Sequence, residues 1–241
     1  MQTFFTMIRL PIILLILCHG LLVAGPAVRV LAWDSEVASR KIALVRGKAT
    51  LEITGMHPDK RSFPLRVEGD GPILLRALDK PFDGNGRAAE IACPIPESVV
   101  HPLVILLSDP SHPTGLRVKV LNDNPEDFPW GVYRFLNATP RELVVQLEKK
   151  AIKLPTGWTP VDLNMGGETR GAGAMIALAD HMDKILYSAV WDYDPGVRTL
   201  CIIVPAADPQ SGPIKIKAVS EIRSAIEAAP PSKENRTGKQ P

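Results

Sequence analysis

Apolar residues along most of the chain occur in short runs or alternate with polar residues, and turn residues separate the runs. Eight such segments precede the stretch NDNPEDFPWG: VRVLAW, KIALV, ATLEIT, FPLRV, ILLRAL, AEIACPI, LVILLS and LRVKVL. About eight follow it: VYRFLN, ELVVQL, AIKLP, VDLNM, AMIALA, KILYSAVWDY, TLCIIVP and IKIKAV. Short segments separated by turn signals such as EGDGP and DGNG are typical of a β-sandwich or barrel. The pattern therefore predicts an all-β protein.

The two halves of the chain repeat the same order of segments. RVLAWDSEVASRKIALVRGKATLEITG, from Arg29, parallels RFLNATPRELVVQLEKKAIKLPTG, from Arg134. LVILLSDPSHPTGLRVKVL, from Leu103, parallels LCIIVPAADPQSGPIKIKAV, from Leu200, and each contains an apolar strand, Asp-Pro, a loop with glycine and an alternating strand. Asp-Pro and glycine are general turn residues, so Asp109 and Asp208 are assigned to turns. The preserved order predicts an internal duplication.

We therefore expect two tandem, duplicated, antiparallel β-sandwich-like domains, at residues 28–122 and 131–219. Residues 123–130 form a short acidic linker that contains two prolines. Because it is short and carries Phe128 and Trp130, it is predicted to pack between the domains.

The last segment differs from the rest. SEIRSAIEAA, from Ser220 to Ala229, has apolar residues at helical spacing and a serine suited to cap the first turn, which predicts a short C-terminal helix. PPSKENRTGKQP, which follows, has no apolar residue and is predicted to be a disordered tail. Together these segments occupy residues 220–241.

The first 27 residues read as a signal peptide. One positive charge, Arg9, precedes an apolar run from Leu10 to Val23, and small residues follow this run. The preferred cut follows Ala27, with Ala24 as the competing site. A retained membrane anchor and lipid attachment at Cys18 stay open, although the residue before Cys18 is a leucine and not a small residue. The segment predicts export to the periplasm, the cell envelope or the medium, with no membrane span after its removal.

Two cysteines, Cys93 and Cys201, remain after this cut. Both lie in strand-like segments, one in each predicted domain, where a buried thiol acts as a small hydrophobic group. We expect both to be unpaired.

The charge balance argues against a nucleic-acid partner. The chain has 28 basic and 26 acidic residues, for a formal net charge of +2. Binding to a phosphate backbone requires a concentrated basic face, which this balance does not indicate.

No motif indicates catalysis. The sequence has no Gly-x-Ser-x-Gly nucleophile motif, no phosphate-binding glycine loop ahead of a helix and no histidine pair at zinc spacing, so no cofactor is predicted. Asp192 and Asp194 lie two residues apart and would share one face of a strand. Such a pair could serve a secreted carbohydrate-active hydrolase. The Asp-Pro-Gly sequence from Asp194 favours a turn instead.

Three places are candidate binding sites. Glu168 and Arg170 occupy the tip of the glycine-rich loop NMGGETRGAG, and loops on a sandwich often carry binding residues. Arg117 and Lys119 in LRVKVL, and Lys215 and Lys217 in IKIKAV, share the polar faces of the two closing strands. If these basic faces are contiguous, they form a candidate surface for an anionic ligand.

A metal site is the alternative for the acidic linker. Asp123, Glu126 and Asp127 are oxygen ligands of the kind that calcium prefers. Pro125 interrupts the set, and the glycine and terminal glutamate of the helix-loop-helix calcium motif are missing. A solvated linker is therefore the preferred interpretation, with no metal.

RVLAWD, FPWGVYRFLNAT and ILYSAVWDYDPGVR resemble a group of exported bacterial β-proteins of unknown function, over most of the mature chain. The resemblance implies export and a β-fold, and no activity. We therefore predict a non-catalytic binding or structural module of the periplasm or cell envelope, with an unidentified protein or envelope component as partner. The alternatives are the secreted hydrolase and an accessory subunit whose partner adds a strand to a sheet edge.

Overall fold

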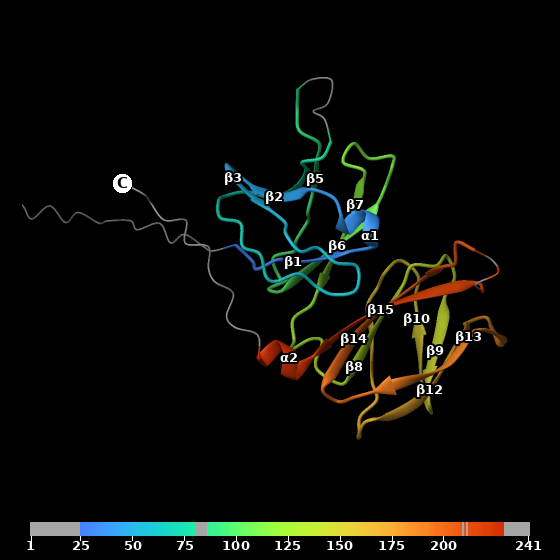
Figure 1. Ribbon diagram of the computed structural model, residues 1–241. Coiled ribbons are helices and arrows are strands. Elements are labelled where there is room, and N and C mark those ends of the chain that lie inside the picture. The colour runs from blue at the N-terminus through green and yellow to red at the C-terminus, as the bar shows by residue number, and fades with distance from the viewer. Residues whose placement is uncertain (1–24, 81–85, 209, 211, 229–241) are drawn as a thin grey trace, which may run out of the picture.

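A computed structural model describes residues 25–80, 86–208, 210 and 212–228 (Figure 1). The strands of the first half are β1 (Arg29–Ala32), β2 (Ile42–Arg46), β3 (Ala49–Glu52), β4 (Ile73–Ala77), β5 (Glu90–Ala92), β6 (Pro102–Ser108) and β7 (Leu116–Asn122). Those of the second half are β8 (Val132–Asn137), β9 (Leu143–Leu147), β10 (Lys150–Leu154), β11 (Val161–Asn164), β12 (Arg170–Leu178), β13 (His181–Tyr193), β14 (Val197–Pro205) and β15 (Ile214–Ile222). The described helices are α1 (Ser35–Ala38) and α2 (Arg223–Glu227). The all-β prediction is confirmed.

Each half forms a sandwich of two sheets, and the strand order is the same in both. The outer sheets have the orders β3-β2-β4-β5 and β10-β9-β12-β13, and the inner sheets have the orders β1-β6-β7 and β11-β8-β14-β15. The counterpart of β11 is a single bridge between Val28 and Leu65, so the predicted strand FPLRV is reduced to that contact. Each inner sheet also contains one parallel pair, β1 with β6 and β8 with β14, in addition to the predicted antiparallel pairs.

The strand register repeats as well. Arg29 lies opposite Leu103 in the first half, and Arg134 lies opposite Leu200 in the second. These are the residues that the two repeated sequence segments place at equivalent positions. The two halves therefore share one topology, while their origin by duplication stays a prediction.

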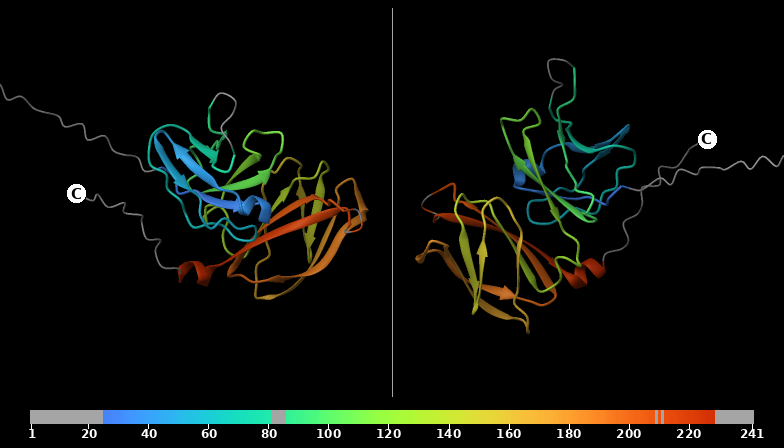
Figure 2. Two further views of the ribbon diagram at one scale, coloured as in Figure 1. Left: turned by 45° about the horizontal axis from the view of Figure 1, so that its top comes forward. Right: turned by 180° about the vertical axis from the view of Figure 1, so that it is seen from behind.

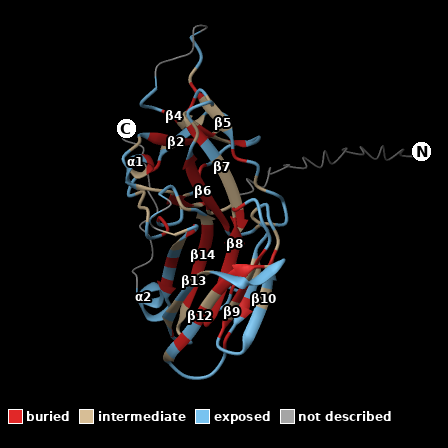
Figure 3. Cartoon of the chain, turned by 90° about the vertical axis from the view of Figure 1, so that its right-hand side faces the viewer, coloured by how far each residue is buried: buried red, intermediate tan, exposed pale blue. Residues whose placement is uncertain are grey.

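The four sheets stack as four layers with three hydrophobic cores between them. Figure 3 shows the buried inner strands β6 and β14 near the middle of the molecule. The inner strands are buried on both faces: in β6, Val104 and Leu106 point into the core of the first domain, and Leu103 and Ile105 point into the core between the domains. Strand β14 alternates in the same way. Burial on both faces explains why LVILL and LCIIV are continuous apolar runs. Figure 2 shows the two halves stacked on each other from two further sides.

The linker packs in this central layer, as predicted. Phe128 is 0% exposed and belongs to the core between the domains. The guanidinium groups of Arg134 and Arg198 lie 4.4 and 5.1 Å from the centre of its ring. Trp130 continues the series, with Arg198 and Arg223 at 5.2 and 5.7 Å from its ring. Stacked cations and rings thus hold the linker against the second domain.

The predicted C-terminal helix is shorter than expected. Strand β15 continues to Ile222, and Ser220 pairs with Thr199 inside it, so Ser220 does not cap a helix. Helix α2 begins at Arg223 and has no side-chain cap. The physical reason is Glu221, whose carboxylate pairs with Arg198 on the neighbouring strand and holds this segment in the sheet.

Residues 1–24 of the predicted signal peptide, including Cys18, lie outside the described residues, as do Ala229 of the predicted helix and the whole predicted tail. No helix within the described ranges has the length and apolar character needed to span a membrane.

Cys93 and Cys201 are free and buried, as predicted. Cys93 belongs to the core of the first domain and Cys201 to that of the second. Burial raises the pKa of the Cys93 thiol to about 12 and raises that of Cys201 as well.

Candidate binding surface

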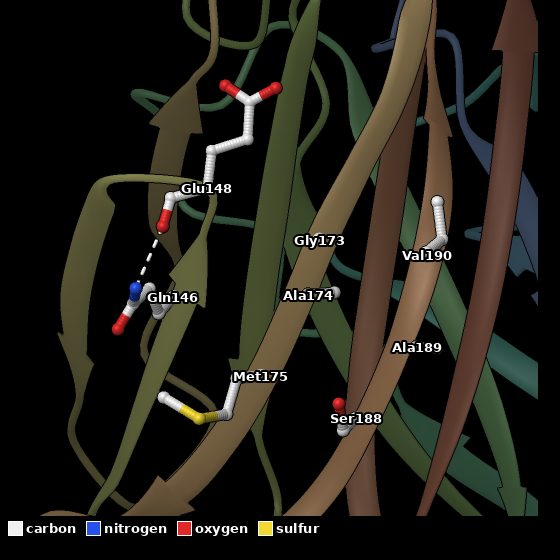
Figure 4. Close-up of a pocket in the computed structure, with 8 residues that line it drawn as sticks. All are labelled: Gln146, Glu148, Gly173, Ala174, Met175, Ser188, Ala189 and Val190. Carbon is white, nitrogen blue, oxygen red and sulfur yellow. Dashed lines mark hydrogen bonds between the residues drawn. The ribbon is translucent and has the colours of Figure 1, made fainter.

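The outer sheet of the second domain carries an open depression of about 510 Å³ (Figure 4). It lies across β9, β12 and β13 and is lined by Gln146, Glu148, Gly173, Ala174, Met175, Ser188, Ala189 and Val190. Figure 4 shows Gln146 and Glu148 on one side of it and Val190 with Ser188 on the other. Most of this lining is apolar or lacks a long side chain.

The sequence of β12 produces the floor of this depression. Ala172, Ala174 and Ile176 are buried in the core, so the alternate positions of the strand face outward. Two of these outward positions are Gly171 and Gly173, which have no side chain. A Cβ atom on Gly173 would meet no heavy atom within 4 Å. Gly173 therefore leaves a hollow where another residue would project, whereas a Cβ atom on Gly171 would lie 3.1 Å from Cγ1 of Val190.

Strand β13 borders the depression and is an edge of its sheet. It pairs with β12 alone, and the pairing is regular from Tyr187 to Tyr193. The odd-numbered aromatic residues of this stretch pack toward the core, whereas Ser188, Val190 and Asp192 are exposed. Val190 is 75% exposed, and Ile185 just before the regular stretch is 55% exposed. Apolar side chains thus lie along an open edge.

Arg170, predicted at the tip of a binding loop, holds that loop closed, and ligand binding by Arg170 and Glu168 stays a prediction. Its guanidinium donates to the carboxylate of Glu148 at 2.7 Å and to the carbonyl oxygens of Gly166 and Glu168 at 2.9 Å each. It also lies 4.9 Å from the ring centre of Tyr193. The hydrogen bond from Arg170 holds the pKa of Glu148 below its ordinary value. The structure therefore places Arg170 beside the depression, while Glu168 is exposed.

The basic strands meet across the domain boundary through two tryptophans. Lys119 of the first domain lies 5.8 Å from the ring of Trp158 in the second, and Lys217 of the second lies 5.5 Å from the ring of Trp33 in the first. The two rings contact each other edge to face, with centroids 6.4 Å apart. Burial lowers the pKa of Lys217. These lysines therefore serve the interface between the domains.

The other two basic residues, Arg117 and Lys215, are exposed on the same strands. An anionic ligand at this face stays a prediction.

A cluster of buried charges lies at the same boundary. It consists of Arg29, Arg61, Arg198, Asp123 and Glu221. Arg61 donates to both carboxylate oxygens of Asp123, at 2.9 and 3.1 Å, and Arg198 donates to Glu221 at 2.6 and 2.9 Å. Burial alone would raise the pKa of Asp123, but the positive charges of Arg61, Arg29 and Arg198 outweigh it and hold this pKa below its ordinary value.

Asp123, the first carboxylate of the alternative calcium site, belongs to this cluster of buried charges. The oxygens of Asp123 accept from arginines, Glu126 is exposed, and Asp127 accepts from the side-chain amides of Asn122 and Asn124. Within the described ranges, no three or more His, Cys, Asp or Glu side chains gather in a way that could hold a metal ion.

Asp192 and Asp194, the alternative catalytic pair, make different contacts. Asp194 accepts a hydrogen bond from the backbone N–H of Gly196 at 2.7 Å, which confirms its assignment to a turn. The side chain of Asp192 is exposed, and its backbone carbonyl accepts from the hydroxyl of Tyr133 at 2.8 Å. Asp109 and Asp208 likewise accept from backbone N–H groups two residues ahead, as expected for turn residues.

The depression was not found from the sequence, although GAGAM in β12 contains the signal of small residues at alternate positions. Which of these positions faces outward depends on the sandwich, and only the fold shows that β13 is an edge. No protein-family model and no curated protein matches the chain.

Proposed function

We propose that the protein is a non-catalytic binding or structural module, exported to the periplasm or cell envelope, which presents the outer sheet of its second domain to a protein partner. The observation that carries this proposal is the open edge of β13, with exposed Val190 and Ile185 beside the depression. Proteins commonly bind an extended segment of a partner at such an edge.

The shape of the depression supports a protein partner over a small molecule. Sites for small molecules are concave and enclose most of their ligand, with a few convergent polar groups. Here the hollow is open, and its charged member Glu148 is already paired with Arg170. An extended apolar surface of a protein fits this arrangement better.

The contacts that the other candidate residues make within the protein support a role without catalysis. Asp194 and Arg170 hold turns and loops, and Asp123 and Lys217 lie in the contact between the domains. Their chemistry therefore serves the fold. The central core also fixes the two domains to each other, which suits a rigid structural element.

The experiment is site-specific photo-crosslinking in cells that produce the protein. A photoreactive residue at Val190 is expected to form one adduct of defined mass. The same residue at Val100, which is 63% exposed in the first domain, is the matched control and is expected to form none. Equal labelling at both positions, or no adduct at Val190, would reject the proposed binding surface.

A further inference from the structure

We infer that the protein partner is a second copy of the chain, whose β13 pairs antiparallel with this β13 around Val190. The inference rests on the proposed function, because it uses the same surface. It joins the two four-stranded outer sheets into one sheet of eight strands.

The first argument is that β13 lacks the protection found at the equivalent edge. In the first domain this edge is β5, which has only 3 residues, carries Glu90 in an ion pair with Arg76, and is followed by Pro94 and Pro96. Short length, charge and proline all prevent pairing with another chain. Strand β13 has 13 residues, and the stretch from Ile185 to Trp191 contains no charged residue and no proline.

The other edge strands in the described part of the chain are charged or short. Strand β7 carries the exposed Arg117 and β15 the exposed Lys215, whereas β1, β3, β10 and β11 have 4 or 5 residues each. The two register shifts between β12 and β13 lie between Ile176 and Leu178, outside the regular stretch. The regular stretch of β13 carries one charged residue, Asp192, and no proline, and a long edge of regular geometry is a template for strand pairing.

The second argument is that the regular stretch, Tyr187 to Tyr193, is complementary to itself. Its middle residue is Val190, and antiparallel pairing about this residue places Val190 opposite its own copy. On the core side, Ala189 then faces Trp191 of the second copy, so a small residue meets a large one. On the outer side, Ser188 faces Asp192 of the second copy, where a hydroxyl can donate to a carboxylate. Such opposed pairs are the units that stabilise a sheet.

Pairing in this way also accounts for the depression. Val190 and Ser188 line it on the β13 side, so the twofold axis would bring the two hollows together across the central strands. The exposed Val190 side chains would then cover each other, as in an isologous interface.

The first test is the mass of the purified protein by light scattering at about 100 µM, where contacts of micromolar affinity are saturated. A dimer is expected. Val190→Lys places two like charges opposite each other and is expected to yield a monomer with unchanged circular dichroism. Val100→Lys is the matched control and is expected to leave the dimer intact. A monomeric parent protein, or a dimer unaffected by Val190→Lys, overturns the inference.

Cysteine cross-linking tests the register. Opposed residues in an antiparallel pair have Cα distances within the range of a disulfide, so Val190→Cys is expected to form a covalent dimer on oxidation. A mixture of Ser188→Cys and Asp192→Cys chains is expected to form the mixed dimer in excess over either homodimer. Equal amounts of all three dimers would reject this register.

The outcome also separates the two proposals. A monomeric protein that still forms one adduct with a different protein from Val190 rejects self-pairing and keeps the proposed function. Absence of any adduct together with a monomer rejects both.

Discussion

Arg29, in the first strand of the first domain, donates to the carboxylate of Glu221, in the last strand of the second, at 2.5 Å across 192 positions of sequence. Arg198 donates to the other oxygen of the same carboxylate. Glu221 therefore connects the two domains, because its carboxylate binds Arg29 in β1 of the first domain and Arg198 in β14 of the second. With Asp123 it balances three buried guanidinium groups.

Replacing this carboxylate is expected to destabilise the protein strongly. Glu221→Gln leaves three guanidinium groups against one carboxylate, and breaking a buried ion pair on one side costs about 3 to 5 kcal/mol. Urea unfolding followed by tryptophan fluorescence measures the loss. Glu227→Gln, an exposed change in α2, is the control and should shift the free energy of unfolding by less than about 0.5 kcal/mol. A loss below about 1 kcal/mol for Glu221→Gln would contradict the assigned role.

The low pKa of Asp123 predicts a loss of stability in acid. Because the folded pKa lies below the value in the unfolded chain, the contribution is fully present above the unfolded aspartate pKa of about 3.9. It disappears as the pH falls through the folded pKa. The difference in urea midpoint between the parent and Asp123→Asn should therefore be constant near neutral pH and shrink below about pH 4. A difference that does not change with pH would argue against the charge of Asp123.

The buried thiols should be unreactive in the folded protein. Because the pKa of Cys93 is raised to about 12 and that of Cys201 is raised too, the thiolate is scarce near pH 8 and solvent access is blocked. A thiol reagent should label neither cysteine in the native mature protein and both after unfolding in guanidinium chloride. Labelling of native Cys93 or Cys201 at the rate of free cysteine would show that its domain opens.

The burial of Val28 favours the competing cut after Ala24 over the cut after Ala27 that the sequence prefers, so a cleaved chain is expected to begin at Gly25. The backbone N–H of Val28 donates to the carbonyl of Leu65 at 2.8 Å, and Val28 is fully buried. A cut after Ala27 would place a charged amino group at this position, whereas a cut after Ala24 leaves three residues before it. The intact mass of the exported protein distinguishes the two ends. A mass that corresponds to a chain beginning at Val28 would favour the cut after Ala27.

The sequence predicts local structure better than contacts between distant residues. The order of apolar and polar residues in runs such as LVILL and IKIKAV predicts that they form strands and which of their faces are buried. The repeated segments also predict equivalent positions, such as Leu103 and Leu200. Asp123 and Glu221 read as a linker residue and a helix residue, because their arginine partners lie in other strands and leave no local signal. Val190 reads as one outward residue of a strand, and only the sheet order identifies its strand as an edge.

The shared strand order also bears on how the chain reaches its folded state. Strands β6 and β14 are alike in burial and register, although β6 has 7 residues and β14 has 9, so during refolding each could enter the other's sheet, in the same molecule or in a neighbouring one. Tandem domains of equal topology are prone to this exchange. The two halves contribute different charged residues to the ion pairs at the domain boundary. This difference favours the arrangement in which each strand lies in its own sheet. Refolding yield should therefore fall as protein concentration rises, and the misassembled product should consist of exchanged domains.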